Sequence, residues 1–169
     1  GDLKIVGPPT TASDKIFHGA LFYYILAPIY NVAGNSPEVA AAALRVVNAL
    51  GVFLTFYIGR IIFRKEVGLI SAFLFAVSYE QSQYAIFFGH PSPAVISALI
   101  FYLGLALIIF KKNPLGWVIS VIGLGLTIQF EDVNALLIFV FIAFILIFYK
   151  KIKWPNFKTI LFAFSGASR

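Results

Sequence analysis

The sequence predicts an all-α fold, a polytopic bundle of transmembrane helices with one further helix lying at the membrane interface in an external loop. Three observations predict it. Hydrophobic residues make up 60% of the 169 residues and charged residues only 12%, against about 25% charged in a typical soluble domain. The mean hydropathy is +0.92. The apolar residues also form long runs that are separated by short charged turns. This much apolar surface requires lipid as its solvent.

Five apolar runs are long enough to be considered as membrane spans. Helices are expected there because a backbone in lipid must pair its own N–H and C=O groups. The predicted spans cover residues 39–63, 67–88, 94–110, 115–130 and 133–149, and a sixth run begins near residue 159.

The residues before the first span, 1–38, are predicted to form an external loop. Within it, residues 19–33 are apolar and aromatic but fall short of the about 20 residues that a spanning helix needs. They are therefore predicted to form an interfacial helix. Ser36, Pro37 and Glu38 have the pattern of a helix start, with a capping hydroxyl, a first-turn proline and an acid near the positive end of the helix dipole.

We expect residues 1–169 to form a single partial membrane domain. The chain contains no Met, opens in a turn-rich segment and stops inside an apolar run. These features are typical of a fragment of a longer protein.

The net charge of +6 does not indicate a nucleic-acid partner, because the basic residues form no patch. Instead, nine of the 13 basic residues follow alternate spans: Arg60, Arg64, Lys65, Lys111, Lys112, Lys150, Lys151, Lys153 and Lys158. All acidic residues except Glu66 fall at the opposite ends: Asp2, Asp14, Glu38, Glu80, Glu131 and Asp132. The positive-inside rule then places the basic turns in the cytoplasm and the acidic turns outside.

The external loop supplies the first candidate site residues. Asp14 is a candidate catalytic carboxylate, and Lys15 is suited to pair with a lipid phosphate. His18 precedes the short apolar helix, where Tyr23 and Tyr24 suit an interfacial depth because their rings are apolar and their hydroxyls prefer water or headgroups. We predict that Lys15, His18, Tyr23 and Tyr24 bind substrate.

Arg45 lies about two turns into the first span, where a guanidinium is costly unless it has a partner or a wet cavity. One interpretation is a clamp for a phosphate or pyrophosphate. The other is an arginine that extends to the interface or pairs with an outer carboxylate.

Two further candidates lie between the second and third spans. Glu80 is a candidate substrate ligand if it faces the interior of the bundle, and a solvated carboxylate otherwise. His90 lies in the sequence "HPSP", which predicts a rigid turn whose Ser92 is placed to cap the third span. His90 is either a substrate ligand or a solvated turn histidine.

The turn between the fourth and fifth spans, "TIQFEDVN", holds Gln129, Glu131 and Asp132. Adjacent carboxylates can supply an acid and a base or hold a divalent metal. We predict catalytic roles for Glu131 and Asp132 and substrate binding by Gln129. The alternative is that Asp132 caps the fifth helix and Glu131 is merely solvated. The metal requirement is left open, and no other cofactor is expected.

Other chemistries lack their signatures. The sequence contains no cysteine, no Ser-His-Asp order, no His/Cys metal spacing, no phosphate-binding glycine loop and no dinucleotide fingerprint.

The order of features resembles the polytopic glycosyltransferases of the C-type fold, in the branch related to protein O-mannosyltransferases and to the aminoarabinose transferase of lipid A. The resemblance lies in "VGPPTT", "FHGALFYYILAP", "RVVNAL", "IGRIIFRKEVGLISAFLFAVS", "GHPSPAV" and "GLGLTIQFEDV". It covers most of the chain. The chain departs from the family pattern at Ala20, at His90 and at Glu131, where the family has proline, asparagine and histidine.

The resemblance implies transfer of a sugar from a polyprenyl-phosphate carrier to a lipid, glycan or protein acceptor, with inversion, at the external or periplasmic face of a prokaryotic cell membrane. It implies a general-base carboxylate in a loop upstream of this chain. It also implies that "FHGALFYYILAP" covers the lipid-carrier site. The sequence leaves two alternatives: a transporter or flippase for a polar or lipid-linked substrate, which should show paired broken helices, and a non-catalytic membrane scaffold.

Overall fold

The computed structural model describes residues 6–10 and 13–156, and these form an all-α bundle with a small hairpin at one end. The sixth apolar run, with Lys158, lies outside the described residues, as do Asp2 and the side chain of Asp14. Two helices, α2 (Pro37–Ile62) and α5 (Pro91–Phe110), are long and apolar enough to cross a membrane. Their length and apolar composition agree with the membrane bundle that the composition predicts.

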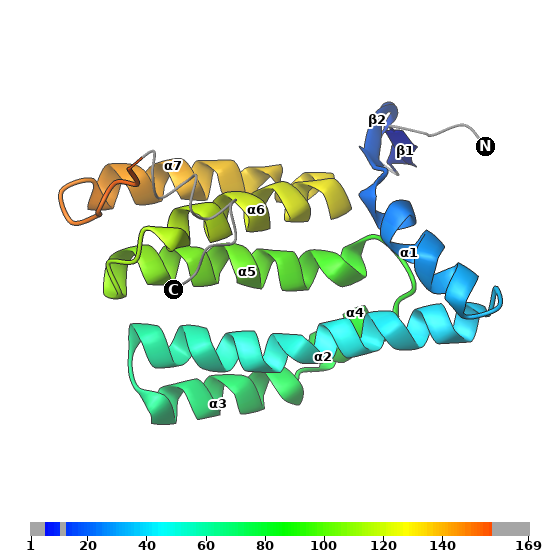
Figure 1. Ribbon diagram of the computed structural model, residues 1–169, viewed down its shortest axis with the longest axis horizontal. Coiled ribbons are helices and arrows are strands. Elements are labelled where there is room, and N and C mark those ends of the chain that lie inside the picture. The colour runs from blue at the N-terminus through cyan, green and yellow to red at the C-terminus, as the bar shows by residue number, and fades with distance from the viewer. Residues whose placement is uncertain (1–5, 11–12, 157–169) are drawn as a thin grey trace.

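The helices form two layers that run nearly along the long axis of the molecule (Figure 1). One layer holds α2 and α3 (Lys65–Ala76). The other holds α5, α6 (Leu115–Phe130) and α7 (Leu137–Phe148), and α2 contacts α5 between the layers. A 3-10 turn, η1 (Asp132–Leu136), joins α6 to α7. These helices fall within or close to the predicted apolar runs.

The hairpin of β1 (Val6–Thr10) and β2 (Ser13–Gly19) occupies the start of the predicted external loop, where we expected no strands. It leads into α1 (Leu21–Val32), which matches the helix predicted at 19–33. The predicted start of α2 is confirmed, since the Ser36 hydroxyl accepts a hydrogen bond from the Val39 N–H at 3.4 Å.

The run 67–88 is not one continuous helix. α3 ends at Ala76, and a short helix, α4 (Tyr79–Ile86), begins after Ser78. The physical reason is local. The Ser78 hydroxyl accepts from the Gln81 N–H at 3.4 Å, and the Ser82 hydroxyl donates to the Ser78 carbonyl at 3.0 Å, so the polar residues here cap a new helix.

α5 and α6 touch through glycine. A Cβ added to Gly116 would lie 2.6 Å from the Gly104 carbonyl oxygen and 2.9 Å from the Ile108 backbone nitrogen. The two backbones are therefore in direct contact, as small residues allow between helices in membranes.

Buried polar side chains join the helices at the end where α5 begins. The Asn48 amide donates to the Ser92 hydroxyl at 2.7 Å, and the Thr127 hydroxyl donates to the Ala94 carbonyl at 3.2 Å. Ser92 therefore ties α5 to α2, and the expectation that it caps α5 is wrong. The sequence "HPSP" forms the first turn of α5, with His90 at the N-cap position, rather than a separate turn.

The basic turns gather at one end of the bundle. α2, α5 and α7 finish at this end, and α3 and α6 begin there (Figure 1). Lys112 donates to the Lys151 carbonyl at 2.6 Å, which ties two of these turns together. The hairpin, α1 and the start of α7 lie toward the opposite end.

Candidate active site

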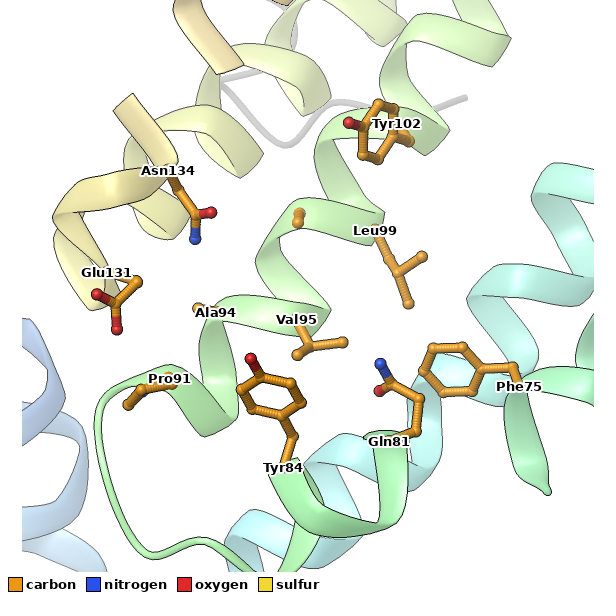
Figure 2. Close-up of a pocket in the computed structure, with 11 residues that line it drawn as sticks. Phe75, Gln81, Tyr84, Pro91, Ala94, Val95, Leu99, Tyr102, Glu131 and Asn134 are labelled. Atoms are coloured by element: carbon orange, nitrogen blue, oxygen red, sulfur yellow. The ribbon is translucent and has the colours of Figure 1, made fainter. Parts of the chain in front are cut away.

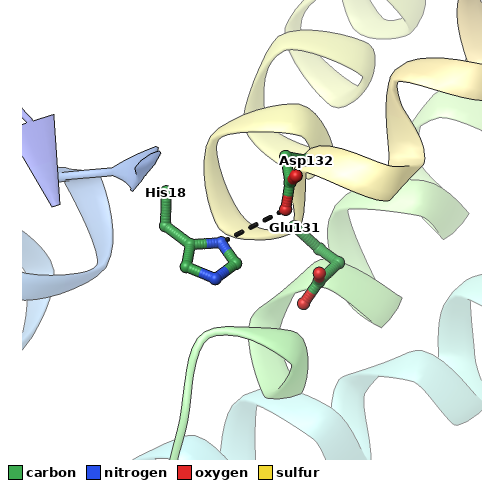
Figure 3. Close-up of side chains that lie close together, drawn as sticks. All are labelled: His18, Glu131 and Asp132. Carbon is green, nitrogen blue, oxygen red and sulfur yellow. Dashed lines mark ion pairs between the residues drawn. The ribbon is translucent and has the colours of Figure 1, made fainter. Parts of the chain in front are cut away.

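The end opposite the basic turns brings His18 together with Glu131 and Asp132, which we call the His18 cluster (Figure 3). His18 lies near the end of β2, and both carboxylates lie where α6 ends and η1 begins. One candidate ligand atom from each residue lies within 4.8 Å of the others. The Nδ1 atom of His18 is 3.4 Å from Oδ1 of Asp132, which is an ion pair when the ring is protonated.

This Nδ1 atom is buried and makes no hydrogen bond with any described residue. The His18 side chain is 14% exposed and that of Asp132 is 31% exposed. An imidazole nitrogen and two carboxylates in this arrangement can relay a proton or hold a divalent cation.

Asp132 is the first residue of the 3-10 turn, whose N-cap position is held by Glu131, and the N-cap of α7 is Leu136. The alternative in which Asp132 serves as a helix cap is therefore wrong, and its carboxylate is directed to His18 instead.

His90 connects this cluster to α1. Its ring stacks on the His18 ring, with centroids 4.8 Å apart and 13° between the planes. Its Nε2 atom is 2.9 Å from the Tyr23 hydroxyl, and the Phe22 ring packs at 4.8 Å. The His90 ring is partly exposed, as a turn histidine would be, but it is also held between His18 of β2 and Tyr23 of α1. The Tyr23 hydroxyl likewise contacts His90 rather than being left only to headgroups.

Burial and neighbouring charge shift two titrating groups here. Burial raises the pKa of the Glu131 carboxyl; a protonated His18 lowers it, and the Asp132 charge raises it. Burial lowers the pKa of His90, and the His18 charge adds to this effect. A carboxyl that binds its proton more tightly than usual is a stronger base once ionised.

Gln129 packs against the junction of β2 and α1. A Cβ added to Gly19 would lie 2.5 Å from the Gln129 backbone oxygen and closer still to the Gln129 side chain. Only glycine fits at this position, and that close approach brings His18 to the end of α6.

A pocket of about 430 Å³ opens beside Glu131, and we call it the α4–α5 pocket (Figure 2). Its lining residues come from α3, α4, α5 and the start of η1: Phe75, Gln81, Tyr84, Pro91, Ala94, Val95, Ala98, Leu99, Tyr102, Glu131 and Asn134. Glu131 belongs to both the pocket and the His18 cluster.

A second, larger hollow of about 800 Å³ lies between the hairpin and α1, and we call it the hairpin groove. Its lining is mostly apolar: Val6, Gly7, Pro8, Phe17, Ala20, Tyr23, Tyr24 and Ala27. Tyr23 joins the hairpin groove to the His18 cluster, because its hydroxyl contacts His90.

Comparison with protein families decides what kind of protein carries this site. Residues 18–168 match the family described as dolichyl-phosphate-mannose-protein mannosyltransferase. The chain belongs to this family. It is a membrane glycosyltransferase, and the matched region begins at His18. No curated protein and no solved structure matches the chain.

The remaining predicted site residues of this glycosyltransferase lie apart from the His18 cluster. Within the described part of the chain, Arg45 is exposed on α2 and lines neither the α4–α5 pocket nor the hairpin groove. Glu80 is exposed on α4, beside Gln83 and Tyr84, so it does not face the bundle interior. Lys15 is exposed on β2.

Sequence reasoning missed Tyr84 and Asn134 as candidate site residues, and it did not assign Gln81. Gln81 and Tyr84 follow the helix break at Ser78. Asn134 lies three residues after Glu131, where a single turn brings both side chains to one pocket. The signal for all three was polarity inside an otherwise apolar run.

Proposed function

We propose that this membrane glycosyltransferase moves a sugar from a polyprenyl-phosphate donor to a lipid, glycan or protein acceptor at the external face of a prokaryotic cell membrane. One observation carries the proposal beyond the family. Glu131, a carboxylate with a raised pKa, lines a pocket and belongs to the His18 cluster, at the end of the bundle opposite the basic turns.

In the proposed step, Glu131 accepts the proton as the acceptor O–H bond breaks. The acceptor oxygen forms a bond to the anomeric carbon of the sugar. The bond from that carbon to the phosphate oxygen breaks at the same time, and its electron pair leaves with the polyprenyl phosphate. Attack opposite the departing phosphate inverts the anomeric configuration. Asp132 and His18 position Glu131 and adjust its proton affinity.

The hairpin groove is the proposed site of the polyprenyl chain. Its mostly apolar lining matches the apolar surface of a polyprenyl chain. In this proposal Tyr23 and Tyr24 border the carrier. Lys15, and Arg45 if the donor reaches it, stabilise the charge on the departing phosphate.

The sequence predicts Asp14 as a catalytic carboxylate and Glu80, His90 and Gln129 as substrate ligands, and these roles stay predictions. In this proposal His90 and Gln129 hold the hairpin and α1 against α6. Asp14 remains a candidate carboxylate.

A divalent cation at the His18 cluster is the second role we consider, because the cluster offers one imidazole nitrogen and two carboxylates. Such an ion would stabilise the departing phosphate. Loss of transfer after chelation, with recovery on adding Mg²⁺ or Mn²⁺, supports this role. Full activity in chelator leaves Glu131 as base without a metal.

The test uses the full-length protein in native membranes, with radiolabelled polyprenyl-phosphate mannose and glucose as donors. We expect Glu131→Gln to lower transfer by about 100-fold or more, which is the usual scale for removing a general base. The matched control is Glu66→Gln, since Glu66 is exposed at the basic end. Equal turnover by both variants rejects Glu131 as base. No transfer by the wild type from either donor rejects the donor class.

A further inference from the structure

The helix break at Ser78 has a local consequence that the proposed function does not use. A continuous helix over 67–88 would give a run of lipid-facing and packing positions. Instead α4 turns away from α3 and carries Gln81 and Tyr84 to the α4–α5 pocket (Figure 2). Ser78 starts α4 with its side-chain cap, which fixes where these two residues fall.

Polar groups reach this pocket from two sides. Gln81 and Tyr84 extend from α4, and Glu131 and Asn134 face them from the turn after α6 (Figure 2). The Asn134 amide donates to the Thr127 hydroxyl at 3.0 Å, and that hydroxyl donates to the Ala94 carbonyl at 3.2 Å. Asn134 is thereby held in one orientation at the edge of the pocket.

The rest of the lining is apolar and partly aromatic. A pocket with polar groups on two sides and apolar side chains on the others suits a ring with one polar rim and two apolar faces. Phe75 lies beside Gln81, and Val95 and Leu99 of α5 form another wall (Figure 2). Ala98 of α5 also lines the pocket. A pocket of about 430 Å³ is of the size that holds a small molecule rather than a long chain.

The hairpin groove provides the contrast. Among the described residues that line it, the polar side chains are those of Tyr23 and Tyr24, whereas the α4–α5 pocket offers two amides, a carboxylate and two tyrosine hydroxyls. Amide and carboxylate groups are matched to sugar hydroxyls, which both donate and accept hydrogen bonds. A polyprenyl chain offers these groups no hydrogen-bond partner, whereas sugar hydroxyls can pair with them.

We propose, in an extension that rests on the proposed function, that the α4–α5 pocket holds the ring of the transferred sugar and that Gln81 and Tyr84 select among sugars. Glu131 then stands at the rim of the sugar site, where the acceptor hydroxyl must approach. Asn134 is a positioning residue for the same ring. A site built to hydrogen-bond a hydroxyl discriminates against a sugar that lacks it or presents it differently.

The test measures donor selectivity of the full-length enzyme in lipid nanodiscs. The donors are polyprenyl phosphates that carry mannose, its epimer glucose, or the pentose arabinose. We expect Tyr84→Phe and Gln81→Ala each to lower kcat/KM for the preferred sugar by about 3- to 10-fold, the scale of one hydrogen bond. We expect the ratio between the preferred sugar and its epimer to shrink by a similar factor.

Two further variants complete the test. Gln83→Ala is the matched control, because Gln83 lies on α4 but lines a different hollow, and it should leave the ratios unchanged. Ala98→Leu fills the wall of the pocket and should lower transfer of the two hexoses more than that of the pentose. If an α4 variant does not fold, as judged by size-exclusion elution, Ala98→Leu still tests whether the α4–α5 pocket holds the sugar.

The two proposals fail in different ways. If the wild type transfers sugar but Tyr84→Phe, Gln81→Ala and Ala98→Leu all keep the selectivity of Gln83→Ala, the pocket does not hold the sugar and only the present inference is overturned. If the wild type uses none of the three donors, the proposed function falls and this inference falls with it.

Discussion

The two ends of the bundle differ in charge, packing and openness. At one end the connections are short and basic, and the exposed pair Arg64 and Glu66 lies at the turn between α2 and α3. The other end carries the β1–β2 hairpin, α1 and the break between α3 and α4. The His18 cluster and the α4–α5 pocket lie at this end. The basic end has the features needed to fix topology, and the opposite end has the features needed for chemistry.

The largest expected effect concerns which end faces outward. The 169 residues contain no cysteine, so within them an introduced cysteine is the single thiol that a maleimide can label. We expect a membrane-impermeant maleimide applied to intact cells to label Val133→Cys, whose parent side chain is 65% exposed, and to leave Lys111→Cys unlabelled. Both should react once the membrane is permeabilised. Labelling of Lys111→Cys alone would invert the topology and remove the external-face proposal.

The second prediction concerns the stability of the protein and the close contact between α5 and α6. Gly116→Ala places a Cβ against the backbone of α5, and overpacking of this kind costs about 1–3 kcal/mol. Gly125, on the same helix, has no neighbouring atom within 4 Å of an added Cβ. We expect Gly125→Ala to be neutral or to stabilise the helix by up to about 1 kcal/mol. Thermal unfolding of the full-length protein in detergent measures both, and equal midpoints would contradict the close contact of α5 and α6.

Much of this comparison could be predicted from the sequence. The apolar runs indicated the helices, and the charge alternation indicated which turns share an end, because each crossing of the membrane reverses the side of the next turn. The start of α2 followed from Ser36 and Pro37 alone. The pair Glu131 and Asp132 was also visible, because carboxylates are rare at the edge of apolar runs.

Tertiary contacts decided the rest. The stacking of His18 on His90 joins residues that are 72 positions apart, and no local pattern encodes it. The hairpin escaped prediction because Pro8 and Pro9 resemble a loop. The break at Ser78 escaped because the polar residues that follow it were assigned to the outer end of one continuous span rather than to a new helix. Arg45 is a candidate from sequence because a guanidinium is costly in lipid. Its side chain is nevertheless exposed on α2 and lies outside both the α4–α5 pocket and the hairpin groove.

The smallest expected effect tests the electrostatics of the His18 cluster. Burial raises the pKa of Glu131 above the ordinary value of 4.5, so the acidic limb of kcat/KM should lie above that pH if Glu131 is the base. Asp132→Asn removes a negative charge that opposes ionisation of Glu131, so the limb should move to lower pH. His18→Ala removes a positive charge that favours ionisation, so the limb should move to higher pH.

We expect each movement to be below about one pH unit, because Glu131 is partly exposed and solvent screens these charges. Profiles of the wild type and both variants, with Glu66→Gln as the distant control, measure the two shifts. Movement in the same direction would show that the limb belongs to another group, and the acidic end would then lack its proposed base.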